Sequence, residues 1–108
     1  HVIVIKRSVY EANPWIAMSL YKAFLAAQQL VYQDMKETVV LKTMFPWMNY
    51  YLDQVRTEMG EDYWPWNIVG TKHNLETLMR YSCEQALLKQ SFTMEEIFAK
   101  ETFSGFKI

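Results

Sequence analysis

The hydrophobic and polar positions of this chain follow a helical repeat over most of its length. Asn13-Pro14 opens the clearest run, because Asn accepts a hydrogen bond from a free backbone N–H and Pro at the first helical position loses none. From Trp15 onward apolar residues recur at helical spacing, at Ile16, Leu20, Phe24, Ala27 and Val31. The pattern predicts a long helix over residues 14–35.

A second helix is predicted over residues 46–59. Pro46 suits its first turn, and Gly60 follows its last apolar position, where glycine can end a helix in a left-handed cap. The apolar positions fall at one-turn and two-turn intervals, at Met48, Leu52, Val55 and Met59. Tyr50 and Tyr51 are adjacent and cannot share one helix face, so at most one of them can belong to the core.

Two further helices are predicted toward the C-terminus. One covers residues 72–89, with apolar residues on one face, and its cap is Thr71 or Asn74. Thr93 and Glu96 have the spacing of a capping box, in which each side chain bonds to the other residue's backbone. This spacing indicates a short final helix over residues 94–99.

The N-terminal residues 1–6 have a different pattern. Val2, Ile3, Val4 and Ile5 are apolar on both faces, which is typical of a strand buried between layers. The best second candidate, residues 37–41, fits a helix end or a loop equally well. A strand without neighbours indicates that its sheet lies elsewhere in a larger protein. The expected fold is mostly α, with three main helices, a short C-terminal helix and one N-terminal strand, in a single domain over residues 1–108.

Composition and charge exclude several classes of function. The 108 residues are 51% hydrophobic and 21% charged, which is typical of a globular chain. Eleven basic residues are scattered among twelve acidic ones, so neither nucleic acid nor an anionic membrane is expected as a partner. No apolar run approaches the ~20 residues that span a bilayer. Cys83 is the single cysteine, which excludes an internal disulfide and a cysteine-based zinc cage.

Motifs for common chemistries are missing from the sequence. It has no Ser-His-Asp order, Gly-rich phosphate loop, Cys-x-x-Cys pair or His-Glu-x-x-His motif. Glu61 and Asp62 are adjacent carboxylates without a third placed ligand, so they indicate a solvated acidic turn and no metal site. The sequence identifies no cofactor.

Three stretches together resemble one family. They are His1-Val2-Ile3-Val4-Ile5-Lys6-Arg7 with Asn13-Pro14-Trp15, then Met59-Gly60-Glu61-Asp62-Tyr63-Trp64-Pro65-Trp66, and then Leu75-Glu76-Thr77, Arg80-Tyr81 and Glu84-Gln85. They look like the C-terminal part of 4,5-dihydroxyphthalate decarboxylase-like proteins. The similarity runs from the first residues to about Phe98, and the uncommon Gly-Glu-Asp-aromatic-Trp-Pro string makes it fairly specific.

The resemblance implies a C-terminal fragment of a two-lobed α/β protein of the type-2 periplasmic-binding-protein kind, with its ligand held in the cleft. It implies a lyase of aromatic catabolism, which would be cytoplasmic and would release carbon dioxide from an aromatic carboxylic acid. The alternative is the solute-binding receptor of an ABC-type transporter for a small anionic or aromatic ligand, which would be periplasmic. A secretory signal peptide on the full-length gene would favour the receptor. Alone, the chain is expected to be inactive, because an interlobe site needs groups from both walls.

The sequence departs from the family at two places. Thr71-Lys72 stands where relatives are expected to have Asn-Arg, and Ser82-Cys83 stands where they are expected to have a His pair. If those family residues contact the substrate, this departure counts against decarboxylation.

Five residues are candidates for a site. His1 is the candidate catalytic acid, because its charge can change near neutral pH. The candidate substrate-binding residues are Arg80, Trp64, Trp66 and His73. Arg80 has a fork of donors that suits a carboxylate, and the two tryptophans can stack on an aromatic ligand.

Each candidate also has a structural explanation. His1 can be an ordinary residue at a chain end, and His73 a solvated or capping residue at the start of a helix. Arg80 can form an i,i+4 ion pair with Glu76 or Glu84. Trp64 and Trp66, on either side of Pro65, can hold their loop on the core.

Self-association is the last expectation from the sequence. An apolar strand without its sheet exposes unpaired backbone groups, and such edges recruit partners. A homo-oligomer is therefore expected, through residues 2–5 or through the aromatic surface near Trp15 and Trp64.

Overall fold

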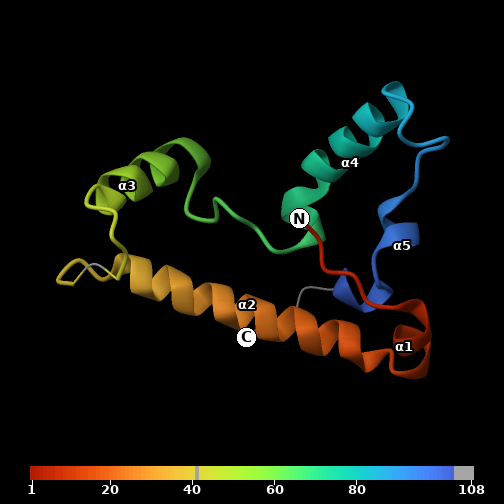
Figure 1. Cartoon of the computed structure of the whole chain (residues 1–108), viewed down its shortest axis with the longest axis horizontal. Helices are drawn as coiled ribbons and strands as arrows, with labels where there is room; N and C mark the ends of the chain where they lie inside the picture. The colour runs from red at the N-terminus through yellow and green to blue at the C-terminus, as the bar shows by residue number, and fades with distance from the viewer. Residues whose placement is uncertain (41, 104–108) are drawn as a thin grey trace. The chain divides into compact units, whose positions relative to one another are not determined.

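The chain is helical, with irregular segments between the helices (Figure 1). The computed structural model describes residues 1–40 and 42–103. In chain order the elements are α1 (Arg7–Ala12), α2 (Trp15–Lys36), α3 (Met48–Met59), α4 (Ile68–Glu84), α5 (Met94–Ile97) and the 3₁₀ turn η1 (Lys100–Thr102). The prediction of a mostly helical chain is confirmed.

The chain divides into two compact units. The first unit contains His1–Tyr21 and Trp66–Ile108, and the second contains Lys22–Pro65. Helix α2 contributes its beginning to the first unit and the remainder to the second. The single domain expected over residues 1–108 stays a prediction.

The predicted N-terminal strand is wrong. Residues 1–6 have no regular secondary structure, and the part of the chain that the structure describes contains no strand. β-Branched residues favour an extended backbone, but a strand forms only where a neighbour takes up its backbone hydrogen bonds. The described residues therefore give no support to an α/β lobe of the periplasmic-binding-protein kind. Residues 37–40 are also irregular, and Leu41 lies outside the described residues.

Helix α1 was missed by the sequence pattern. Its first and last turns are linked by an i,i+4 ion pair between Arg7 and Glu11, with 4.0 Å between Nη1 and Oε1. It ends at Ala12, and the next residue, Asn13, has an extended φ of −142°, because the proline that follows disfavours helical backbone at the residue before it. In the first unit the Tyr10 hydroxyl donates to Glu101 Oε2 at 2.8 Å, which joins α1 to η1.

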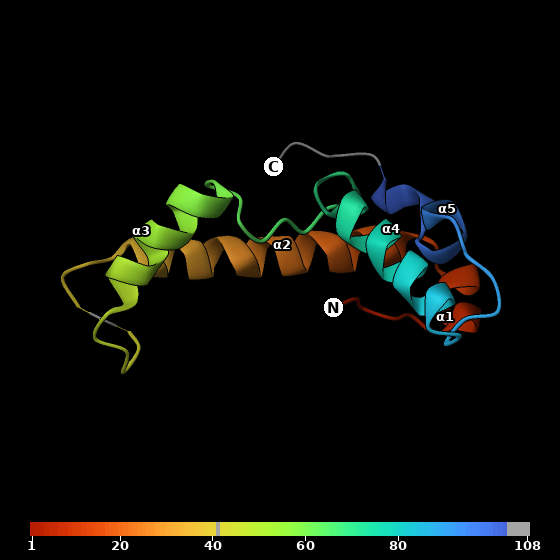
Figure 2. The ribbon, with the colours of Figure 1, turned by 90° about the horizontal axis from the view of Figure 1, so that it is seen from above.

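Helices α2 and α3 agree with their predicted ranges. Helix α2 has 22 residues. Its ribbon is unbroken in both views (Figure 1 and Figure 2). Helix α3 begins two residues after Pro46 and ends at Met59, as the apolar spacing indicates. Gly60 follows with a φ of 88°, a region that favours glycine. Its ψ of 175° is that of extended backbone, so Gly60 does not have the left-handed helical conformation that was predicted for the cap.

Helix α4 begins and ends earlier than predicted. Its cap is Asn67, whose Oδ1 accepts a hydrogen bond from the Gly70 N–H at 2.6 Å, so neither Thr71 nor Asn74 is the cap. At the other end Ala86 has a φ of 59°, and its N–H bonds to the Cys83 carbonyl oxygen while the Leu87 N–H bonds to that of Ser82. These two bonds form a Schellman motif with alanine in the glycine position. This motif stops the helix before residue 89.

Helix α5 has the predicted capping box. The backbone N–H of Thr93 donates to Glu96 Oε2 at 2.7 Å, and the reciprocal half is also present. The helix ends at Ile97, two residues short of the predicted range. This N-terminus was predictable because both partners of the box lie within four residues of each other.

Little of the apolar side-chain surface is covered. Among the described residues the buried apolar side chains are Ala17, Leu52 and Met94. Large side chains such as Val4, Trp15, Trp47 and Val69 are mostly exposed. Within the described residues no helix is both long and apolar enough to cross a membrane. This apolar surface indicates contacts beyond those within each unit.

Candidate functional site

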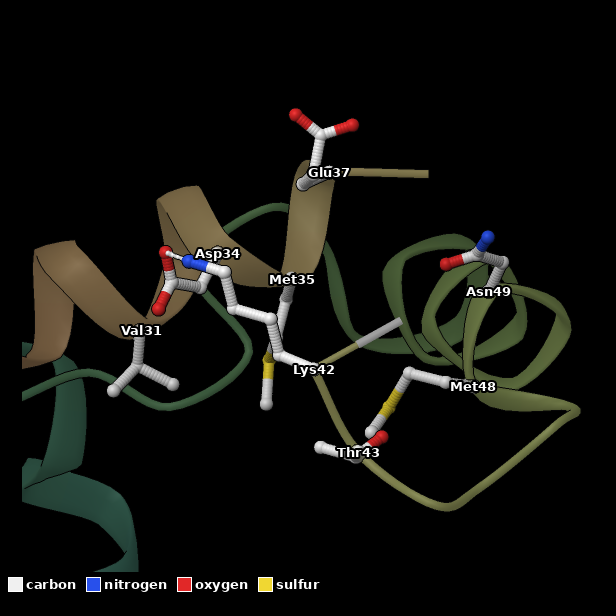
Figure 3. A pocket seen from close by; sticks show the side chains of 8 residues that line it. All are labelled: Val31, Asp34, Met35, Glu37, Lys42, Thr43, Met48 and Asn49. Carbon is white, nitrogen blue, oxygen red and sulfur yellow. Dashed lines mark hydrogen bonds and ion pairs between the residues drawn. The ribbon is translucent and has the colours of Figure 1, made fainter. Parts of the chain in front are cut away.

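A small pocket opens in the second unit, beside the C-terminal end of α2 (Figure 3). Its lining comes from α2, the segment after it and the start of α3: Val31, Asp34, Met35, Glu37, Lys42, Thr43, Met48 and Asn49. The space is about 160 Å³. Pockets that bury a drug-sized ligand hold roughly 300–1,000 Å³, so this one is small.

The charges in the pocket do not suit an anionic ligand. Lys42 reaches across to Asp34, with which it forms an ion pair (Figure 3). Glu37 adds a second carboxylate, whose Oε1 accepts a hydrogen bond from the Val39 N–H at 2.9 Å. A dicarboxylate would meet two like charges and one lysine that is already paired. The pocket therefore fits an aromatic diacid neither in size nor in charge.

A second candidate feature is the junction between α2 and the loop of residues 61–65, within the second unit. Gln28 Nε2 donates to the backbone carbonyl oxygen of Trp64 at 2.7 Å. The Tyr32 and Tyr63 rings lie 5.3 Å apart, tilted by 41°, and the Tyr63 hydroxyl approaches the Met35 sulfur at 3.8 Å. Three positions at helical spacing on α2 thus hold the loop.

This junction presents the Trp64 indole to solvent. Its side chain is 60% exposed, although its backbone is fixed by Gln28. Burial raises the pKa of the nearby Tyr32 phenol, and the charges of Tyr63 and Asp62 raise it further against the opposing hydrogen bond from Gln28. The phenol therefore stays neutral at physiological pH. An exposed indole on a fixed backbone is suited to stacking on an aromatic ring.

Helix α4 brings two of the predicted site residues onto one exposed face. His73 and Arg80 are seven residues apart, which places them on the same side of the helix about 10 Å from each other. Arg80 Nε lies 3.7 Å from Glu84 Oε1, and its guanidinium lies 5.0 Å from the Tyr81 ring centroid. The i,i+4 pair expected for Arg80 is thus formed with Glu84, whereas Glu76 pairs with Lys72 at 3.7 Å.

The remaining predicted residues are not gathered with these two by any described contact. His1 is exposed at the beginning of the first unit, and Trp66 is half-buried in the same unit. Trp64 belongs to the second unit. Across the described residues, no group of three or more His, Cys, Asp or Glu side chains is placed to hold a metal ion.

The residues that organise the α2 junction were missed by sequence reasoning. Gln28, Tyr32 and Met35 lie at i, i+4 and i+7, and this spacing was the available signal. The prediction of the long helix used its apolar positions alone and did not consider that polar residues on the same helix could hold a loop. The tryptophans of the loop were singled out, whereas the contacts with α2 given above are made by Tyr63 and by the Trp64 backbone.

Comparison with known proteins adds one relative. The chain is 22% identical to a 4,5-dihydroxyphthalate decarboxylase of Comamonas testosteroni over all 108 residues. It spans about a third of that protein, namely 33% of its length. No protein-family model matches the chain. The chain is therefore similar, distantly and in part, to a protein that bears this name.

Proposed function

We propose that the chain is the C-terminal part of a decarboxylase acting on 4,5-dihydroxyphthalate or a similar aromatic acid, and that it is inactive in isolation. The observation that carries this proposal is the similarity to a decarboxylase of that name along the full 108 residues. The chain spans 33% of that relative, and the pocket described above fits an aromatic diacid poorly. Groups outside this chain would complete the site.

The chemistry requires few groups. The bond between the ring carbon and the carboxyl carbon breaks, carbon dioxide leaves, and the ring carbon takes up a proton from an acid. A cation is also needed to hold the carboxylate that remains. On α4, Arg80 is our candidate for the carboxylate and His73 for the proton, because both lie on one exposed face.

The roles of the other candidates follow from their exposure. The Trp64 indole offers a surface for stacking on the aromatic ring, and Trp66 a second, less exposed one. His1 remains an alternative acid, since its imidazole is exposed and can both donate and accept a proton. Replacing His1 or His73 by Gln in turn and comparing pH–rate profiles would identify the acid.

Arg80 provides the sharpest test, in a longer protein that contains this chain. Arg80→Ala should raise KM for 4,5-dihydroxyphthalate about 10-fold to 100-fold, because a hydrogen bond to a charged group is lost. Arg80→Lys should recover part of the loss, since lysine keeps the charge without the fork. Lys89→Ala removes an exposed cation after the end of α4 and is the control.

The possible outcomes separate the two readings. Formation of the decarboxylated phenol, with the Arg80 effect, supports the lyase. Tight binding of an aromatic acid without carbon dioxide release would favour a receptor and contradict the proposal. An unchanged KM in Arg80→Ala would remove Arg80 from the site while leaving the reaction itself open to the product assay.

A further inference from the structure

One face of α3 has the wrong polarity for contact with water. The inward face follows the helical repeat, and its buried or half-buried residues are Met48, Asn49, Leu52, Val55 and Arg56. Met48 and Asn49 line the pocket (Figure 3). Away from this inward face, Tyr50 and Tyr51 are both exposed, and the exposed positions that follow are polar at Gln54, Thr57 and Glu58. A solvated helix face is expected to be polar throughout.

The exposed rings form a continuous cluster with the residues just before the helix. Phe45 stacks on Tyr51 with 5.5 Å between centroids and 19° between planes, and Tyr50 meets Tyr51 edge-on at 5.4 Å. Trp47 stands directly before α3, where its carbonyl oxygen accepts a hydrogen bond from the Tyr51 N–H at 3.1 Å, and its indole is exposed. We call Phe45, Trp47, Tyr50 and Tyr51 the aromatic patch.

The aromatic patch has the composition of an interface core. Its four side chains are 43%, 68%, 64% and 48% exposed in chain order. From Thr38 to Leu52 the sequence has a single charged residue, Lys42, and that residue is paired with Asp34. Interface cores are depleted in charge and enriched in aromatic residues and methionine. The patch also has a polar margin on α3, as energetically important contact residues usually do.

The exposed area is close to what a dimer needs. At about 200 Å² for each aromatic side chain, the four rings expose roughly 450 Å². Two copies would thus bury roughly 900 Å² through these rings alone. Val39, Val40 and Met44 precede the patch in the chain and are also mostly exposed, so burying them as well would carry the total past about 1,200 Å², the lower limit of stable interfaces.

We infer that the aromatic patch is a contact surface for a second copy of this chain. A two-fold interface places the same surface on both sides, so it requires a surface complementary to itself. An uncharged aromatic face meets this condition, because no like charges oppose each other across the axis and the rings can stack. The chain's net charge of −1 adds little repulsion between copies. This inference is independent of the proposed decarboxylase activity.

Sedimentation equilibrium of the 108-residue chain tests the inference. The mass should rise with concentration from 12.9 kDa toward twice that value. Tyr50→Lys should weaken the dimer at least about 30-fold, because it removes a central ring and opposes two charges. Gln54→Lys adds the same charge one turn further along the exposed face and is the matched control. Circular dichroism should show unchanged helix content in both variants, since both positions are exposed.

The outcomes are decisive in either direction. A dimer that Tyr50→Lys breaks and Gln54→Lys leaves intact supports the inference. If the wild-type chain stays monomeric at millimolar concentration, the patch does not bind a second copy, and the inference is wrong. A dimer that survives Tyr50→Lys but is lost in Val4→Lys would locate the contact at the N-terminal residues, and would equally overturn it.

Discussion

Gln28 on α2 donates a 2.7 Å hydrogen bond to the carbonyl oxygen of Trp64, 36 residues further along the chain. The same amide nitrogen lies 3.1 Å from the Tyr32 hydroxyl, whose ring contacts Tyr63. One side chain therefore bonds both to the loop backbone and to Tyr32, the ring of α2 that packs against the loop. The exposed Trp64 indole depends on this bond for its position.

The first prediction concerns this bond. Gln28→Ala should lower the free energy of unfolding by about 1 kcal/mol, because it removes a hydrogen bond and leaves a carbonyl without its partner. Amide hydrogen exchange of residues 61–64 should accelerate more than that of α3. Gln29→Ala, one residue along on the exposed side of α2, is the control. Equal acceleration in both variants would mean that Gln28 does not hold the loop.

The second prediction concerns the end of α4. Ala86 has a φ of 59° at the position where a Schellman motif favours glycine. Ala86→Gly should raise the free energy of unfolding by about 0.5–1 kcal/mol, because it relieves the strain of a side chain in left-handed backbone. Urea denaturation measures the difference. Ala26→Gly in α2 should lower stability by about 1 kcal/mol, so a loss in Ala86→Gly as well would contradict the assignment.

The third prediction is a pH dependence from the contact between α1 and η1. A hydrogen bond from its own backbone amide, followed by the bond from Tyr10, lowers the pKa of the Glu101 carboxyl. The bond to Glu101 raises the pKa of the Tyr10 phenol, with burial as the next cause. Glu101 thus stabilises the fold at pH values above its pKa in the unfolded chain. This stabilisation is lost as the pH falls through the lower pKa that Glu101 has in the folded chain. Tyr10 stabilises the fold at pH values below its pKa in the unfolded chain. This stabilisation is lost as the pH rises through the higher pKa that Tyr10 has in the folded chain.

Carbon-13 NMR titration of the Glu101 carboxyl checks the third prediction. In Tyr10→Phe the pKa of Glu101 should move back toward its ordinary value, and the added stability between the two titrations should shrink. Tyr50→Phe removes a phenol elsewhere in the chain and should leave that titration unchanged. An unaltered Glu101 pKa in Tyr10→Phe would show that the bond is absent in solution.

Local pattern was enough to predict most of the helices. Helix α2 lies within one residue of its predicted range at each end, because its apolar repeat and Asn13-Pro14 are signals contained in the helix itself. The capping box of α5 is local in the same way. The start of α4 carries a local signal too, since Asn67 is a residue type that caps helices, although the predicted caps were Thr71 and Asn74.

Features that depend on distant partners were not predictable. The strand expected at residues 2–5 requires a neighbouring strand, and none occurs among the described residues. Helix α1 has only six residues and is joined to η1 by a contact that spans 91 positions. In the candidate site, the pair of Arg80 with Glu84 followed from i,i+4 spacing. The spacing of Gln28, Tyr32 and Met35 marks one side of α2, but nothing in the sequence indicates that the partner of Gln28 is Trp64, 36 positions away.

The proposal that this chain is one part of an aromatic-acid decarboxylase has one most direct test. That test is carbon dioxide release from carboxyl-labelled 4,5-dihydroxyphthalate, measured for the isolated chain and for a longer protein that contains it. We expect release above the buffer rate only from the longer protein, because the isolated chain lacks the second wall of the site. Release by the isolated 108 residues, or none by a folded longer protein, would contradict this account.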